Sequence, residues 1–142
     1  MSDASLLIAM REAHIRLALV DGLRGQYTVH SVADVAMVMA AVRQHHPARV
    51  LLGVGPRWTV SADLCRRLKT EAGQPPCVGL VDAKGRIQHP QEVARTCLAD
   101  GIFQGEVDPE AIASFVGSLS GSSPVFVGEP SRRGRILRWM GR

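Results

Sequence analysis

The sequence predicts an α/β fold in which a parallel sheet of five strands carries helices on both faces. Three observations support this class. Short apolar runs end at glycine, proline or polar residues, as buried strands do. Each run is followed by a longer segment of helical spacing, as where Leu64 and Leu68 follow the run that ends at Gly53. The two patterns alternate five times, which is the order of a doubly wound (βα)5 sheet.

The strands are expected where apolar residues run together or alternate with polar ones. They are residues 5–10, 27–32, 48–53, 77–81 and 101–104. The helices are expected at residues 13–23, 33–46, 59–70 and 90–99, with a fifth that begins after Asp108. Pro47 ends the second helix, because the residue before a proline disfavours the α region. Asp108 and Pro109 suit the N-cap and first position of the fifth helix, whose buried face is predicted to be Ile112, Phe115, Val116 and Leu119.

The length of 142 residues suits one domain with a sizeable core. No apolar run approaches the roughly 20 residues of a membrane-spanning helix, and the N-terminus lacks the basic region that starts a signal peptide. The three cysteines, Cys65, Cys77 and Cys97, have no metal-binding spacing and are expected to be buried as small apolar residues. A reducing, cytoplasmic location is therefore predicted, with no metal or cofactor.

The net charge of +4 is concentrated at the C-terminal end. Residues 1–119 contain 12 Lys and Arg against 12 Asp and Glu, whereas the last 23 residues contain five arginines against Glu129 alone. We therefore expect a domain at 1–119, a Ser/Gly/Pro linker at 120–131 and a basic amphipathic tail at 132–142. Within the linker, residues 125–127 suit either a minor edge strand or a docking peptide. The tail combines Trp139 with Arg132, Arg133, Arg135 and Arg138, which suits an anionic surface.

Four stretches of the chain, taken together, resemble one known family. They are residues 6–16, 26–34, 46–69 and 99–112, and the likeness covers about 5–119 with hardly a gap. On these stretches the chain is similar to the receiver domains of bacterial response regulators, which have a flavodoxin-like (βα)5 fold. Active receivers transfer a phosphoryl group from a histidine kinase to an aspartate. That reaction needs a carboxylate nucleophile, an acid pair that holds Mg²⁺, a hydroxyl and a lysine.

The resemblance implies that each of these positions is altered in the present chain. Gly53 stands where the family has its phosphorylated aspartate, and Met10 and Arg11 stand where it has the acid pair. The hydroxyl position is Val81, and the lysine position is Gly105. The chain is therefore expected to be a degenerate receiver, or pseudo-receiver, that is not phosphorylated at the usual site and is not an enzyme.

Three other residues near these positions are candidates for a role. Glu12 and Asp82 are candidates for holding a metal or a bridging water, although a pair of solvated loop carboxylates is the favoured interpretation. Trp58 is expected to cap the vacated pocket or, as the alternative, to stand exposed as a contact residue. Asp100 has no arginine partner in the fifth helix, so a charged dimer network is not expected there.

The leading functional hypothesis is a non-catalytic, phosphorylation-independent signalling module that binds another protein. Its partner would contact the side of the third and fourth helices, including Trp58, or the tail. The alternative is a localisation protein whose tail binds an anionic membrane, a polymer or an acidic partner. A third hypothesis is a small-molecule sensor that uses an empty acidic pocket. A homodimer through the last helix stays open, whereas specific nucleic-acid binding is not expected, because the domain itself is neutral.

Overall fold

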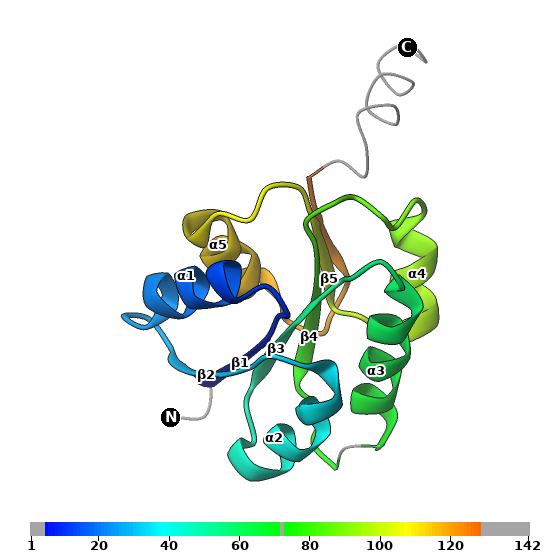
Figure 1. Cartoon of the computed structure of the whole chain (residues 1–142). Helices are drawn as coiled ribbons and strands as arrows, with labels where there is room; N and C mark the ends of the chain where they lie inside the picture. The colour runs from blue at the N-terminus through cyan, green and yellow to red at the C-terminus, as the bar shows by residue number, and fades with distance from the viewer. Residues whose placement is uncertain (1–4, 72, 129–142) are drawn as a thin grey trace.

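The computed structural model describes residues 5–71 and 73–128, which form one parallel sheet between two layers of helices (Figure 1). The strands are β1 (Ser5–Ala9), β2 (Thr28–Val32), β3 (Arg49–Gly53), β4 (Cys77–Asp82), β5 (Gly101–Gln104) and β6 (Val125–Val127). The helices are α1 (Ala13–Leu23), α2 (Val38–His45), α3 (Trp58–Glu71), α4 (Pro90–Cys97) and α5 (Pro109–Ser118). A 3₁₀ turn, η2 (Val35–Met37), precedes α2. The predicted alternation of strands and helices is confirmed.

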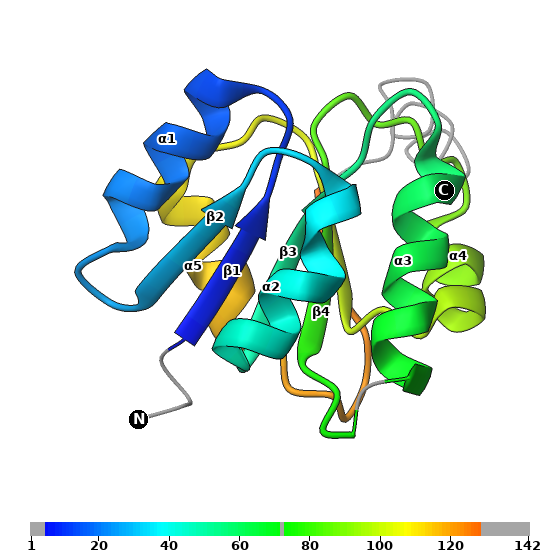
Figure 2. The same ribbon diagram turned by 60° about the horizontal axis from the view of Figure 1, so that its bottom comes forward.

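The sheet order is β2-β1-β3-β4-β5-β6, and every neighbouring pair is parallel. Helices α1 and α5 cover one face, and α2, α3 and α4 cover the other (Figures 1 and 2). All strands therefore end at the same edge of the sheet, which we call the C-terminal edge. In open α/β sheets this edge is where ligands bind.

The sixth strand corrects the prediction of a five-stranded sheet. Val125 lies opposite Gly101 and Val127 lies opposite Phe103, so β6 extends the sheet beyond β5. Of the two interpretations of this segment, the edge strand is the one that forms, and part of the predicted linker belongs to the sheet. The physical reason is apolar packing: Val125 and Val127 lie against the core on the α1 and α5 side, which the Ser- and Gly-rich flanking sequence does not reveal.

Successive strand residues point to opposite faces and build two separate cores. Leu7, Leu52 and Leu80 pack on the face that α2, α3 and α4 cover. On the opposite face the predicted residues of α5, Ile112, Phe115, Val116 and Leu119, are all buried, as expected. The homodimer surface suggested for this helix is thus largely occupied by the core of the same chain.

Two glycines allow α5 to lie close to the sheet. A Cβ atom added to Gly79 or to Gly101 would lie 2.7 Å from a side-chain carbon of Phe115 or Leu119, respectively. Contacts this short require the neighbouring groups to move. Glycine at both positions therefore permits Phe115 to pack directly on β4, which carries the altered position Val81, and on β5.

The helix ends follow their capping residues. Asp108 accepts a hydrogen bond from the N–H of Ala111 at 3.1 Å, which confirms it as the N-cap of α5. The segment predicted as one helix at 33–46 is instead η2 followed by α2. Asp34 accepts a hydrogen bond from Ala36 N, so the chain enters α2 through a capped 3₁₀ turn.

Within the described residues, none of the helices has the length and apolar character needed to cross a membrane.

Candidate functional site

The positions that the resemblance matches to a phosphorylation site lie at the C-terminal edge of the sheet. Met10 directly follows β1, Gly53 ends β3 and Gly105 follows β5. Val81 lies opposite Gly53 in the register of β3 and β4. The Cγ atom of Met10 lies 3.4 Å from the point where a Cβ atom on Gly53 would stand. The structure therefore brings Met10, Gly53 and Val81 into one place, as the resemblance implies.

This place is apolar where an active receiver is charged. Met10 is 5% exposed and Val81 is 2% exposed, and both belong to the core on the α1 and α5 side. The space beside Gly53 is further limited by the carbonyl oxygen of Ala9, 3.3 Å from the position of an added Cβ atom. A divalent cation needs oxygen ligands, and these side chains supply none.

The backbone oxygens of this edge are already hydrogen-bonded within the chain. The buried Ser61 hydroxyl, from the second turn of α3, donates to the carbonyl of Gly53 at 2.9 Å. The Arg16 guanidinium, from α1, donates to the carbonyl of Met10 at 2.7 Å. These bonds hold α1 and α3 against the strand ends. Each of the two carbonyls therefore already accepts a hydrogen bond from a side chain of the same protein.

Asp82 is not a solvated loop carboxylate, which corrects the favoured interpretation of this residue. It is fully buried, and its two carboxylate oxygens accept hydrogen bonds from the backbone N–H groups of Arg86 at 2.9 Å and Ile87 at 2.8 Å. The amide of Gln104 donates to Asp82 at 3.0 Å and to the carbonyl of Ile87 at 2.7 Å. Asp82 therefore fixes the loop between β4 and α4, with both carboxylate oxygens bonded to donors of the same chain.

Two adjoining cavities open above the strand ends. Their volumes are about 290 and 150 Å³, and both are lined by Met10, Arg11, Gly53, Gly55 and Pro56. The larger cavity adds Arg57 and Asp34 to this lining, and the smaller adds Glu12, Lys84 and Arg86. We call the two together the strand-end cavity. Its charged lining has four cations and two carboxylates, so the prediction of an acidic pocket is wrong.

Trp58 does not cap the strand-end cavity, because it does not belong to its lining. It begins α3 and is half-buried against the core on the α2, α3 and α4 side. There it lines a groove of about 290 Å³ between α3 and α4, together with Val93 and Cys97. The favoured interpretation of Trp58 as a cap is therefore wrong, because the first turn of α3 directs it toward α4.

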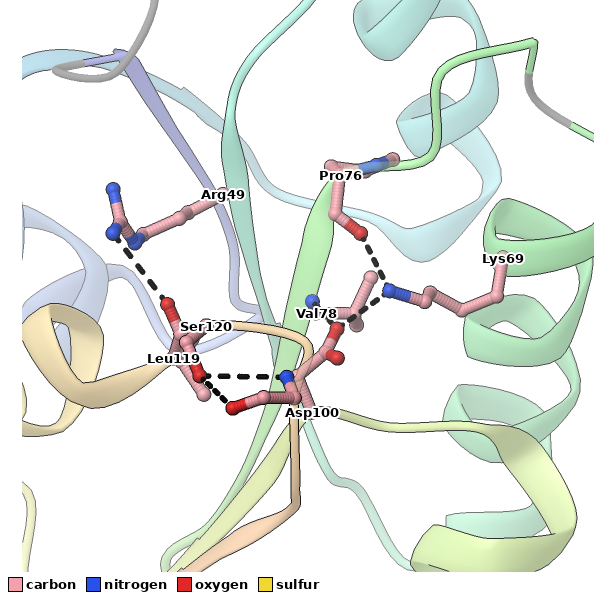
Figure 3. A network of polar contacts seen from close by, with 8 residues as sticks. Arg49, Lys69, Pro76, Val78, Asp100, Leu119 and Ser120 are labelled. Carbon is pink, nitrogen blue, oxygen red and sulfur yellow. Dashed lines mark hydrogen bonds and ion pairs between the residues drawn. The ribbon is translucent and has the colours of Figure 1, made fainter.

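Asp100 has a partner that the sequence analysis did not find (Figure 3). Its carboxylate lies 2.7 Å from the Lys69 ammonium and accepts a hydrogen bond from Val78 N at 2.8 Å. Lys69 also donates to the carbonyl of Pro76 at 3.0 Å. This partner is a lysine from the last turn of α3 and not an arginine of α5. Figure 3 shows this buried pair joining α3 to β4 and β5, which is a structural role.

The cysteines and histidines do not add a site in the described part of the chain. Cys65 and Cys97 are buried and Cys77 is half-buried, and all three are free thiols. Burial, followed by the nearby Asp100 carboxylate, raises the pKa of Cys77, which keeps it protonated. Among residues 5–71 and 73–128, no group of three or more His, Cys, Asp or Glu side chains is placed to hold a metal ion.

The predicted tail contacts, Arg132, Arg133, Arg135, Arg138 and Trp139, lie outside the described residues.

Comparison with known proteins shows a likeness of fold. No protein-family model matches the chain, and no curated protein matches it in sequence. Among solved structures, a response-regulator receiver domain from Bermanella marisrubri covers 82% of this chain and 98% of its own, with a TM-score of 0.71 at 17% identity. The chemotaxis response regulator CheY4 of Vibrio cholerae has the same coverage and a TM-score of 0.71 at 13% identity.

A third solved structure is itself described as a pseudo-receiver. The pseudo-receiver domain of the CikA protein covers 82% of this chain and 96% of its own, with a TM-score of 0.57 at 17% identity. These matches confirm, at the level of fold, the resemblance to receiver domains.

Proposed function

We propose that the chain is a non-catalytic signalling module that uses the receiver scaffold to bind another protein without being phosphorylated. The observation that supports this most strongly is the apolar strand end, where Met10 and Val81 pack around the empty position of Gly53. An acyl-phosphate forms on a carboxylate, and Gly53 has no side chain to carry one. Asp82, a buried carboxylate, is held by three hydrogen-bond donors and does not line the strand-end cavity.

Treatment with a small phosphodonor and Mg²⁺ tests this proposal. We expect the intact mass of the full chain to stay unchanged, while an active receiver domain treated in parallel gains a phosphoryl group. If peptide mapping instead finds an acid-labile phosphoryl group within residues 5–128, the proposal is wrong.

The proposed binding surface is the groove between α3 and α4, with Trp58 as its aromatic member. Aromatic side chains at the centre of an interface often contribute most of its binding energy. The lining also includes Asp63, Glu92 and Arg66. The Arg66 guanidinium donates to the carbonyl of Thr96 at 3.0 Å and ties the two helices together. The groove is thus a surface that combines apolar side chains with charges of both signs.

A capture experiment from the native cell extract tests the surface. Full-length chain, the Trp58→Ala variant and a variant without residues 132–142 serve as baits. Leu17→Ala is the matched control, because Leu17 is 60% exposed and lies on α1, on the opposite side of the sheet. We expect a partner that the wild type and Leu17→Ala retain and Trp58→Ala loses. Retention by Trp58→Ala, together with loss on deleting the tail, would place the contact in the tail instead.

The second candidate function is localisation through the tail. It is favoured by the charge distribution, because the last 23 residues hold five arginines against one glutamate. Short basic segments of this kind bind anionic surfaces, and each additional cation near the surface contributes about 1 kcal/mol. Cosedimentation with anionic vesicles should be lost on deleting residues 132–142. Unchanged sedimentation after that deletion would exclude this function.

A further inference from the structure

We propose that the strand-end cavity reversibly binds a small phosphate-bearing ligand through Arg11, Arg57, Lys84 and Arg86. The proposal concerns non-covalent binding and does not depend on the protein-binding function proposed above. It starts from a reversal of charge: the edge that holds a cation among carboxylates in active receivers is lined here mainly by cations.

The four cations are available to a ligand. Within the described residues, the ion pairs are Arg67 with Glu71 and Lys69 with Asp100, and neither involves a cation of the cavity. All four are exposed at their side chains, and they come from three different loops, after β1, after β3 and after β4. Like charges repel, so their gathering around one cavity is unfavourable unless an anion joins them.

The carboxylates near the cavity offset only part of this charge. Asp34 lines the cavity, and its side chain also accepts the hydrogen bond that caps η2. Glu12 is the other carboxylate of the lining. Asp82 is not part of the lining, and its carboxylate is buried and bonded to the β4–α4 loop. The lining therefore has an excess of two positive charges, from four cations against two carboxylates.

The shape of the cavity suits a compact ligand. Gly53 and Gly55 contribute no side chain, and a Cβ atom added to Gly55 would meet no atom within 4 Å. Met10 and Val81 supply an apolar floor, and guanidinium groups bind phosphate oxygens in pairs. The larger volume of about 290 Å³ lies at the low end of small-molecule sites, which span about 300–1,000 Å³. A small phosphorylated compound fits this space better than a dinucleotide.

The test is an NMR titration of the full chain, in which backbone amide shifts locate the ligand. Inorganic phosphate, pyrophosphate and adenosine monophosphate are the probes. We expect pyrophosphate to shift amides at residues 10–12, 53–58 and 83–87. A tighter response to pyrophosphate than to the nucleotide would identify the phosphate groups as the part recognised. A tighter response to the nucleotide would show that the cavity also accepts its organic part.

Matched variants separate a built site from general charge attraction. The double variant Arg11→Gln/Arg57→Gln should weaken pyrophosphate binding at least tenfold. The control Arg24→Gln/Arg95→Gln removes the same charge from exposed positions outside the cavity lining, and should change the affinity less than twofold. Gly55→Leu adds a side chain to the cavity lining without changing charge and should weaken the shifts, because added bulk at this position competes with the ligand for space.

Three results would overturn the proposal. The first is the absence of shifts at millimolar pyrophosphate. The second is a set of shifts centred on residues 132–142, which would assign the anion to the arginines of the tail. The third is an equal loss of affinity in the control double variant, which would show that pyrophosphate binding depends on the net charge of the protein and not on the cavity. None of these results depends on whether the chain accepts a covalent phosphoryl group, so this proposal and the proposed function fail separately.

Discussion

Replacing Asp82 by alanine tests whether this residue is a structural clamp of the β4–α4 loop. The change removes a fully buried carboxylate that accepts from Arg86 N, Ile87 N and the Gln104 amide at 2.8 to 3.0 Å. A hydrogen bond to a charged acceptor contributes about 1.5–3 kcal/mol, and a buried donor without an acceptor costs about 1–3 kcal/mol. Burial of the carboxylate itself offsets part of this gain.

We therefore expect Asp82→Ala to lower the free energy of unfolding by about 3–5 kcal/mol. Domains are typically stable by about 5–15 kcal/mol, so the variant should fold but unfold at much lower denaturant. Urea unfolding followed by circular dichroism measures the loss. Asp108→Ala is the matched control, because it removes a single exposed N-cap bond and should cost about 1 kcal/mol.

Two outcomes would contradict this account of Asp82. A loss below about 1 kcal/mol, no larger than that of the control, would show that the loop does not depend on the carboxylate. Stabilisation of the wild type by Mg²⁺ that is absent in Asp82→Ala would instead identify Asp82 as a metal ligand. Its burial argues against that role.

Two further predictions concern charges elsewhere in the fold. Lys69→Met should cost about 3–5 kcal/mol in the free energy of unfolding, because it leaves the Asp100 carboxylate buried without its cation; denaturant unfolding measures this loss. The pKa of His30 is lowered, first by burial and then by His45, whose ring stacks on it at 3.7 Å. The unfolded chain therefore binds more protons than the folded one, so stability should fall as the pH drops below about 6.5, and His30→Gln should flatten this dependence in thermal unfolding.

Each of these predictions has an internal control. Arg67→Met breaks the exposed pair with Glu71 and should change stability by less than about 1 kcal/mol. An equal loss in Arg67→Met and Lys69→Met would refute the distinction between a buried and an exposed pair. For the histidine pair, the control is His89→Gln, which alters an exposed histidine at the N-cap of α4, outside the pair. A pH dependence unchanged in His30→Gln would assign the effect to other groups.

Much of the fold is predictable because its signals are local. Strands and helices are marked by hydrophobic spacing, and helix ends by capping residues such as Asp108 and by prolines such as Pro47. These signals depend on neighbouring residues only. The sixth strand is compatible with two interpretations at the level of sequence, because β6 has three residues and is stabilised by its contacts with β5 and the core.

The position of the candidate site could be predicted from the sequence, but the roles of two of the residues near it could not. The register of parallel strands brings Met10, Gly53 and Val81 together, as their places at strand ends imply. The roles of Trp58 and Asp82 were mistaken, because each depends on the direction of one side chain. Trp58 turns toward α4, and Asp82 turns into the loop that follows it. Spacing along the chain does not specify these directions.

The sequence by itself determined which side chains are present and therefore which chemistry is absent from the five altered positions. No packing arrangement can supply a carboxylate where the chain has Gly53, or a hydroxyl where it has Val81. Only the tertiary structure decided what occupies the same edge instead. Arg11, Arg57 and the neighbouring pair Lys84 and Arg86 come from three separate parts of the chain. They converge because the three loops lie at one edge of a parallel sheet. Electrostatic fields depend on distances in space, and these exist only after folding.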